Sequence, residues 1–146
     1  MTPDRAKLLI VDDSRMIRRV LRSLVQGVGF KSIDEAPDGA EALELLRVIP
    51  YDLVLSDWNM PFVSGIELLR TIRHGSVRSD TPLVLFTGDV SAKRMVEALE
   101  EGANGFVAKP FAAGLVCEKI LRIVASLHPA SEFAPARIPE LEPAQT

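Results

Sequence analysis

The chain has 146 residues, of which 47% are hydrophobic and 25% are charged, and this balance is typical of a single globular domain with its own core. Its 17 Lys and Arg residues against 20 Asp and Glu residues give a formal net charge of −3. Such a charge provides no long-range attraction to nucleic acid or anionic lipid, so we expect neither direct DNA binding nor membrane insertion.

Five short apolar runs predict five β-strands, and longer segments with helical periodicity lie between them. The expected strands are residues 8–11, 32–36, 53–56, 83–86 and 105–108. The apolar stripes of the four helices between them are Ile17, Val20, Leu21, Leu24 and Val25; Ala42, Leu43, Leu45 and Leu46; Ile66, Leu68, Leu69 and Ile72; and Met95, Val96 and Leu99. A fifth helix is expected from about residue 113 to residue 127, with an inner face of Leu115, Val116, Ile120, Leu121, Ile123 and Val124.

This alternation predicts the α/β class, with a doubly wound parallel sheet of five strands covered on both faces by five helices. We expect one domain over residues 1–128 and a flexible, proline-rich tail over residues 129–146. The lone cysteine, Cys117, has no partner for an internal disulfide. The apolar stretch near the N-terminus is too short for a signal sequence or a membrane span, so we expect a cytoplasmic protein.

Polar side chains follow four of the predicted strands. They are Asp12 and Asp13 after the first strand, Asp57 after the third, Thr87 after the fourth and Lys109 after the fifth. Each alone has a structural explanation as a cap or turn residue, but the carboxyl ends of parallel strands meet at one edge of a sheet. Three carboxylates gathered there would repel one another without a cation, and an all-oxygen ligand set favours Mg²⁺.

This set of groups is suited to phosphoryl transfer onto a carboxylate. Asp57 is the expected nucleophile, because an aspartate can form an acyl phosphate. Asp12 and Asp13 would hold Mg²⁺, while Lys109 and the Thr87 hydroxyl would bind the phosphoryl oxygens. A carboxylate is already an anion, so the reaction needs no general base.

Four segments resemble the receiver domain of two-component response regulators. They are LLIVDDS (residues 8–14), DLVLSDWNMP (52–61), LVLFTG (83–88) and GFVAKPF (105–111). The resemblance spans residues 7 to about 127 and implies a flavodoxin-like, CheY-like sheet with the strand order 2-1-3-4-5. Because no DNA-binding or enzymatic module follows the last predicted helix, the chain is similar to single-domain receivers.

The resemblance also assigns a role to each residue of the site. It makes Asp57 the phosphoacceptor, Asp12 and Asp13 the acidic pair that binds Mg²⁺, Thr87 the switch hydroxyl and Lys109 the lysine that binds the phosphoryl group.

Three further positions carry expectations from the same family. Asn59 would offer its backbone carbonyl to Mg²⁺, and the Lys109–Pro110 peptide bond would be cis. Phe106 lies at the position of the family's rotating aromatic residue, which is commonly tyrosine. Without the hydroxyl, the packing of Phe106 must carry the switch.

The expected partners are a histidine kinase or histidine phosphotransfer protein as phosphodonor, and an output protein on the fourth helix, fifth strand and fifth helix. That surface would include Lys93, Met95, Val96, Leu99, Phe106, Glu118, Lys119 and Arg122, although core packing is the alternative for Met95, Val96 and Leu99. The first helix carries Arg15, Arg18, Arg19 and Arg22. They form either an ordinary solvated face or, with Met16 as an apolar anchor, a docking site for the donor.

Two other classes of protein remain as alternatives. A phosphatase of the haloacid dehalogenase type needs a second carboxylate two residues after its nucleophile, where this chain has Asn59. We therefore do not expect an enzyme that turns over external substrates. A protein-interaction scaffold of the same fold would not need Asp57 and Lys109. Trp58, the single tryptophan, follows Asp57 and should lie at the margin of the metal site.

Overall fold

The computed structural model describes residues 1–75 and 78–127. Its centre is a five-stranded parallel sheet in the order β2-β1-β3-β4-β5, made of β1 (Lys7–Val11), β2 (Ser32–Ala36), β3 (Leu53–Asp57), β4 (Leu83–Thr87) and β5 (Gly105–Ala108). The helices of the described part are η1 (Pro3–Arg5, a 3-10 turn), α1 (Arg15–Gly27), α2 (Gly39–Val48), α3 (Gly65–Arg73), α4 (Ala92–Glu100) and α5 (Ala113–Ala125). The predicted fold class and strand order are confirmed, and the expected tail lies outside the described residues.

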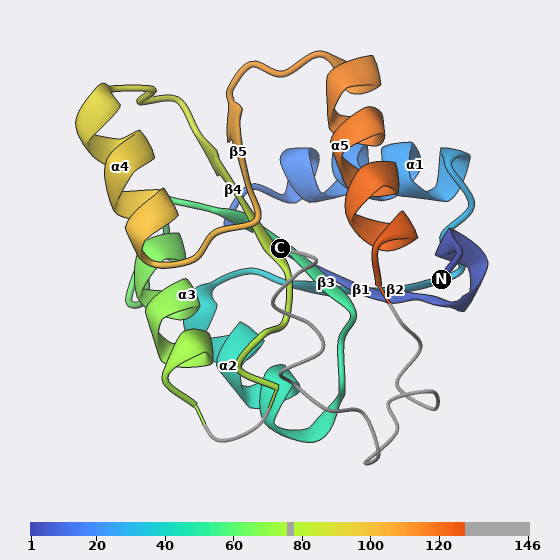
Figure 1. Ribbon diagram of the computed structural model, residues 1–146, viewed down its shortest axis with the longest axis horizontal. Helices are drawn as coiled ribbons and strands as arrows, with labels where there is room; N and C mark the ends of the chain where they lie inside the picture. Colours follow the sequence, from blue (N-terminus) through green and yellow to red (C-terminus); the bar gives the residue numbers. More distant parts are fainter. Residues whose placement is uncertain (76–77, 128–146) are drawn as a thin grey trace, which may run out of the picture.

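Two apolar cores lie on opposite faces of the sheet. Helices α1 and α5 cover one face, and α2, α3 and α4 cover the other (Figure 1). Successive side chains of a strand point to opposite faces, so Leu8 and Ile10 pack toward α1 and α5, whereas Leu9 and Val11 pack toward the other helices. This double burial explains why the central strands are apolar at nearly every position.

Three apolar helix residues do not face the core as predicted, because Val20, Leu115 and Leu121 are exposed. In α4 the exposed fractions are 46% for Met95, 52% for Val96 and 69% for Leu99, so these three residues lie on the surface and not in the core, which was their alternative placement. Among the described residues of α4, only Ala98 is buried. Periodicity indicates that a helix has an apolar stripe, but the stripe is wider than the face that contacts the sheet. The last helix also ends at Ala125 rather than at residue 127.

The strands β3 and β4 are each one residue longer than predicted, and the added residues belong to the expected site. Asp57 is the last residue of β3 and lies opposite Phe86 in β4, while Thr87 ends β4 opposite Ala108 in β5. Ladder pairing therefore fixes the backbone of both residues.

Side-chain caps start four of the five α-helices described. Ser14, Asp38, Ser64 and Ser91 each accept a hydrogen bond from the backbone N–H three residues later, which satisfies a donor that has no partner inside the helix. At α3 the cap is reciprocal, because Glu67 also accepts a hydrogen bond from the Ser64 N–H at 2.8 Å.

The ends of the described core lie side by side. The Met1 amino group donates a hydrogen bond to the Leu127 carbonyl at 3.0 Å, and η1 lies next to the end of α5 in Figure 1. In the described ranges, no helix combines the length and the apolar character needed to cross a bilayer.

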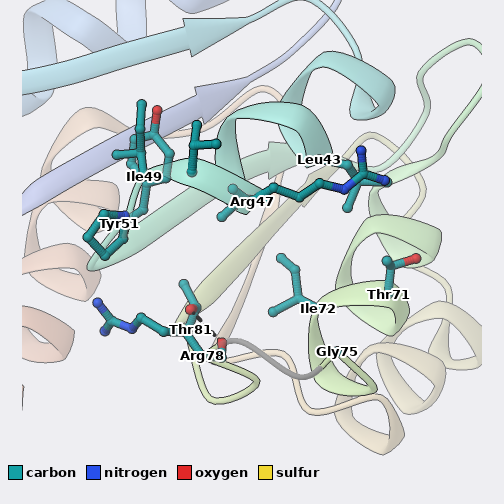
Figure 2. A pocket seen from close by; sticks show the side chains of 12 residues that line it. Leu43, Arg47, Ile49, Tyr51, Thr71, Ile72, Gly75, Arg78 and Thr81 are labelled. Atoms are coloured by element: carbon teal, nitrogen blue, oxygen red, sulfur yellow. Dashed lines mark hydrogen bonds between the residues drawn. The ribbon is translucent and has the colours of Figure 1, made fainter.

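A cavity of about 350 Å³ lies between α2 and α3 (Figure 2). Its apolar lining includes Leu43, Leu46, Ile49 and Ile72, and Tyr51 and Thr81 flank the starts of β3 and β4. These are the amino ends of the strands. The cavity is therefore at the opposite edge of the sheet from the residues expected to carry the chemistry.

Candidate functional site

Three carboxylates meet at the carboxyl edge of the sheet. Asp12 and Asp13 follow β1, and Asp57 ends β3. One carboxylate oxygen from each lies within 4.8 Å of the others. Asp12 and Asp57 are buried, with 1% and 8% of their surface exposed, whereas Asp13 is exposed. The site thus has two fixed carboxylates inside and one at its mouth.

Lys109 brings a positive charge between the two buried carboxylates. Its Nζ donates to Asp12 Oδ2 at 3.0 Å and lies 3.2 Å from Asp57 Oδ1. The Lys109–Pro110 peptide bond is cis, and the Lys109 N–H donates to the Thr87 carbonyl at 2.8 Å. The backbone after β5 is in this way tied to the end of β4.

Burial and charge act on these groups in different directions. Burial raises the pKa of Asp57 above its ordinary value and the nearby charge of Asp12 raises it further, although Lys109 partly offsets both effects. For Lys109, burial alone would lower the pKa, but the hydrogen bond with Asp12 and the charges of Asp12 and Asp57 raise it overall. The carboxylates therefore crowd one another, and the ammonium only partly compensates.

The backbone behind Asp57 is closely packed. The Trp58 N–H donates to the Phe86 carbonyl, and the Gly65 N–H donates to the Trp58 carbonyl, both at 2.8 Å. A Cβ atom at Gly65 would lie 2.2 Å from the Asp57 carbonyl oxygen and 2.9 Å from Leu85 Cδ2. Only glycine therefore lets α3 begin directly behind the end of β3.

Thr87 is fully buried, and its hydroxyl has three neighbours. The oxygen accepts hydrogen bonds from the Asp89 N–H and from Arg94 Nη1, both at 3.0 Å. The hydroxyl itself donates a long hydrogen bond to the Asp89 carbonyl, with 3.4 Å between the two oxygens. Gly88 has open space where a Cβ would lie, so the chain after Thr87 is not confined as it is after Asp57.

Trp58 packs between the site and β5. It is 4% exposed, and its ring meets Phe106 edge-on with 6.2 Å between centroids. The Arg94 guanidinium lies over the same ring, 4.5 Å from the Trp58 centroid. Phe106 is partly buried. Asn59 is exposed and its side-chain oxygen accepts from Arg94 Nη2 at 3.2 Å.

Two of the α1 arginines are not part of a freely solvated face, and for them that expectation is wrong. Arg18 Nε and Arg22 Nε donate to the Glu35 carboxylate at 3.0 and 2.6 Å, and Arg18 Nη1 also donates to the Asp12 carbonyl at 2.6 Å. Burial raises the pKa of Glu35, but the hydrogen bonds from Arg22 and Arg18 outweigh it and lower the pKa overall. Arg15 and Arg19 remain exposed.

The carboxylate cluster fits a hard divalent cation. All three groups offer oxygen, two of them are fixed by burial, and Lys109 does not compensate their charge in full. Oxygen ligands at one open edge are the type of site that Mg²⁺ occupies together with a phosphoryl group.

The model of the response regulator receiver domain family matches residues 8–121. The chain belongs to this family, whose members act as phosphoacceptors in signalling and generally bind Mg²⁺ at an acidic pocket.

Individual relatives make the likeness more specific. Chemotaxis protein CheY-3 of Vibrio cholerae is 38% identical over 117 residues, which cover 80% of this chain and 90% of the relative. Chemotaxis protein CheY of Pseudomonas aeruginosa is 39% identical over 117 residues, covering 80% and 94%. The solved structure of CheY4 of Vibrio cholerae matches with a TM-score of 0.75 and 33% identity, covering 81% of this chain and 98% of the other. The chain is thus CheY-like in sequence and in fold.

Arg94 is the neighbour of the site that the sequence analysis did not identify. Its guanidinium joins the loop after β3 to the loop after β4 through Asn59 and Thr87. The available signal was its place in the first turn of a helix, where the helix dipole disfavours a cation. Arg18, which supports the backbone of Asp12, was noted only as a surface charge.

Proposed function

We propose that Asp57 accepts a phosphoryl group from a histidine kinase or a histidine phosphotransfer protein in a Mg²⁺-dependent reaction, and that the chain signals through its α4, β5 and α5 surface. The observation that carries the proposal is the placement of Asp57 beside Asp12, Asp13 and Lys109 at the carboxyl edge of the sheet. The relatives named above are chemotaxis proteins, so motility is the first output to test.

The chemistry at Asp57 needs few groups. An oxygen of its carboxylate forms a bond to phosphorus while the P–N bond to the donor histidine breaks, and the electron pair of that bond stays on the imidazole nitrogen. Lys109 Nζ, already 3.2 Å from Asp57 Oδ1, is placed to hold one phosphoryl oxygen. The chain then returns to its starting state by hydrolysis of the acyl phosphate and turns over no external substrate.

Asp12, Asp13, Asp57 and the backbone carbonyl of Asn59 would hold Mg²⁺. When bound, the ion supplies positive charge that offsets the repulsion between the carboxylates and an incoming phosphoryl group. The chain's own contribution is to keep the Asp12 and Asp57 carboxylates fixed within reach of each other and of Lys109.

The proposed response begins at Thr87, whose hydroxyl would donate to a phosphoryl oxygen, and continues to Phe106 through packing. The exposed apolar residues of α4 support this direction of signalling. Met95, Val96 and Leu99 lie on the surface, and exposed apolar side chains are available to contact a partner.

Donor docking is proposed on the exposed part of α1. Met16 is 73% exposed, and Arg15 and Arg19 are exposed beside it. Reversing the charge of Arg15 and Arg19 should slow transfer from a protein donor and leave labelling by acetyl phosphate unchanged. The same change at Arg18 and Arg22 would also break the Glu35 pairs, so it serves as the structural control. Equal slowing with both donors would contradict a docking role.

The test of the acceptor is Asp57→Asn, which keeps the shape of the side chain but removes the nucleophile. We expect intact mass spectrometry to show a phosphoryl adduct on the wild-type chain after treatment with acetyl phosphate or phosphoramidate, and none on the variant. Circular dichroism checks that the variant is folded. Chelation of Mg²⁺ should stop wild-type labelling, and Trp58 emission should change saturably as Mg²⁺ is added. A normal yield of adduct on Asp57→Asn would place the acceptor elsewhere.

Residues 1–128 are proposed as the receiver unit and residues 129–146 as an appended tail. Of the first unit the structure describes residues 1–75 and 78–127.

A further inference from the structure

Arg94 has an unusual set of contacts for a helix residue near the surface. Its Nη1 donates to Thr87 Oγ1 at 3.0 Å, its Nη2 donates to Asn59 Oδ1 at 3.2 Å, and its Nε lies 3.5 Å from Asp89 Oδ2. The same guanidinium lies 4.5 Å from the centroid of the Trp58 ring. One side chain therefore connects the residues that follow Asp57 with the hydroxyl that ends β4.

The position of Arg94 in its helix is not explained by helix stability. It is the third residue of α4, where its N–H bonds to the Ser91 cap. The positive end of the helix dipole lies there and disfavours a cation. In α3 the equivalent position holds Glu67, which completes a reciprocal cap. The contacts of the Arg94 guanidinium, rather than those of its backbone, account for an arginine at this site.

The contacts at Thr87 determine what its hydroxyl can do. A hydroxyl oxygen accepts two hydrogen bonds and donates one. Here both accepting positions are taken by N–H groups of Arg94 and Asp89, while the hydroxyl donates only a long hydrogen bond, 3.4 Å between oxygens, to the Asp89 carbonyl. Movement of Thr87 toward a phosphoryl group on Asp57 would stretch the bond from Arg94, because Arg94 is also held by Asn59, Asp89 and Trp58.

We propose that Arg94 is a positioning residue that holds the Thr87 hydroxyl in its resting place, and that phosphorylation of Asp57 must break this hydrogen bond. The inference rests on the proposed function of Asp57. Breaking the bond would leave Arg94 with its contacts to Asn59, Asp89 and Trp58 only. Since Ala98 is the single buried residue among those described in α4, the start of this helix has few other contacts to keep it in place once the hydrogen bond to Thr87 is lost.

Binding of beryllofluoride tests the inference, because this reagent forms a tetrahedral phosphoryl mimic on an aspartate in the presence of Mg²⁺. A ligand that favours the active state must work against every contact of the resting state. Arg94→Ala should therefore bind beryllofluoride roughly three- to tenfold more tightly than the wild type, as measured by calorimetry. Arg94→Lys, with an ammonium in place of the fork, should fall between the two.

Arg47→Ala is the matched control, since Arg47 is exposed on α2 and the change removes the same side chain and charge away from the site. It should leave the affinity unchanged. In a Thr87→Ala background, the effect of Arg94→Ala should disappear, because the group that Arg94 holds is gone. Without any ligand, Arg94→Ala should change the emission of Trp58, and beryllofluoride should move wild-type emission in the same direction.

The outcomes separate the two proposals. A wild-type chain that binds no beryllofluoride overturns the function proposed for Asp57 and this inference with it. If the wild type binds, an unchanged or weaker affinity in Arg94→Ala overturns only the inference, and weaker binding would mean that Arg94 itself holds the phosphoryl group. An equal gain with and without the Thr87 hydroxyl also overturns it.

Discussion

Helices α3 and α4 have the same length and a similar place in the chain, yet the fold holds them very differently. Each has nine residues and follows a strand that ends in a residue of the site. Helix α3 buries Gly65, Ile66, Leu68, Leu69 and Ile72, and it has a reciprocal cap. Helix α4 buries Ala98, and its larger apolar side chains face outward. Arg70 of α3 links the two through ion pairs with Glu97 of α4 and with Glu101, the C-cap residue of α4.

The difference matches two tasks that the proposed function assigns to the edge of the sheet. Asp57, which precedes α3, must stay in one position relative to Asp12 and Lys109 if it is to react. Thr87, which precedes α4, must change position if the reaction is to be detected elsewhere. Displacing a helix that buries little surface costs less free energy than displacing one that is packed into a core. Under the proposed function, a fixed acceptor at Asp57 and the weakly anchored helix α4 would serve these two tasks.

The prediction with the largest expected effect replaces one leucine by alanine in each of the two helices. Leu69→Ala in α3 removes a side chain that is 0% exposed and should lower the free energy of unfolding by about 3 kcal/mol or more. Leu99→Ala in α4 removes a side chain that is 69% exposed and should change the free energy of unfolding by less than about 0.5 kcal/mol. Urea unfolding followed by circular dichroism measures both. Similar losses for the two variants would refute the proposed difference in anchoring.

A second pair compares the turns that lead into the two helices. Gly65→Ala would place a Cβ 2.2 Å from the Asp57 carbonyl oxygen, so we expect a loss of about 2 to 3 kcal/mol and slower labelling by acetyl phosphate. Gly88→Ala meets no atom within 4 Å, and its stability should stay within about 0.5 kcal/mol of the wild type. If Gly88→Ala lowered the stability more than Gly65→Ala, the chain after β4 would be more tightly packed than the chain that leads into α3, contrary to the comparison.

The smallest effect concerns the cap of α3. Hydrogen bonds from the backbone and side chain of Ser64 hold the pKa of Glu67 below its ordinary value. Its contribution to stability is therefore present above the pKa of the unfolded chain and is lost as the pH falls through the lower pKa of the folded chain. Glu67→Gln should be slightly less stable than the wild type near neutral pH and equal to it in acid.

Urea midpoints of both proteins from pH about 7 to about 3 give the comparison. In a Ser64→Ala background the pH-dependent difference should shrink but not vanish, because the side chain of Ser64 is lost while its backbone N–H still donates to the Glu67 carboxylate. If the stability difference between the wild type and Glu67→Gln grew as the pH fell, the proposed role of the Glu67 carboxylate would be contradicted.

The sequence was sufficient for the fold because strand and helix patterns alternate without interruption. It was also sufficient to place Asp12, Asp13, Asp57, Thr87 and Lys109 at one edge, since the carboxyl ends of parallel strands are adjacent whatever the details of packing. Their roles in phosphoryl transfer stay predictions until they are tested by mutation.

Other features could not be predicted, because hydrophobic periodicity carries no information on how closely residues approach one another in the folded structure. The stripe of Met95, Val96 and Leu99 has the spacing of a core face, but the small Ala98 is the residue that approaches the sheet. Arg94 and Arg18 have the composition of surface charges, and their partners are distant in sequence or are backbone atoms. A long side chain has many possible partners, so its contact is set by the folded structure rather than by spacing.

The hydrogen bond between the Met1 amino group and the Leu127 carbonyl has a practical consequence for engineering. Because the two ends of the described core are in contact, a short glycine-rich linker would join residue 127 to residue 1 without spanning the molecule. New termini opened at the exposed turn around Gly102, between α4 and β5, would then give a circular permutant whose cut lies beside the weakly anchored helix. For the same reason the core could be inserted into a loop of a host protein, where it would enter and leave at nearly the same point.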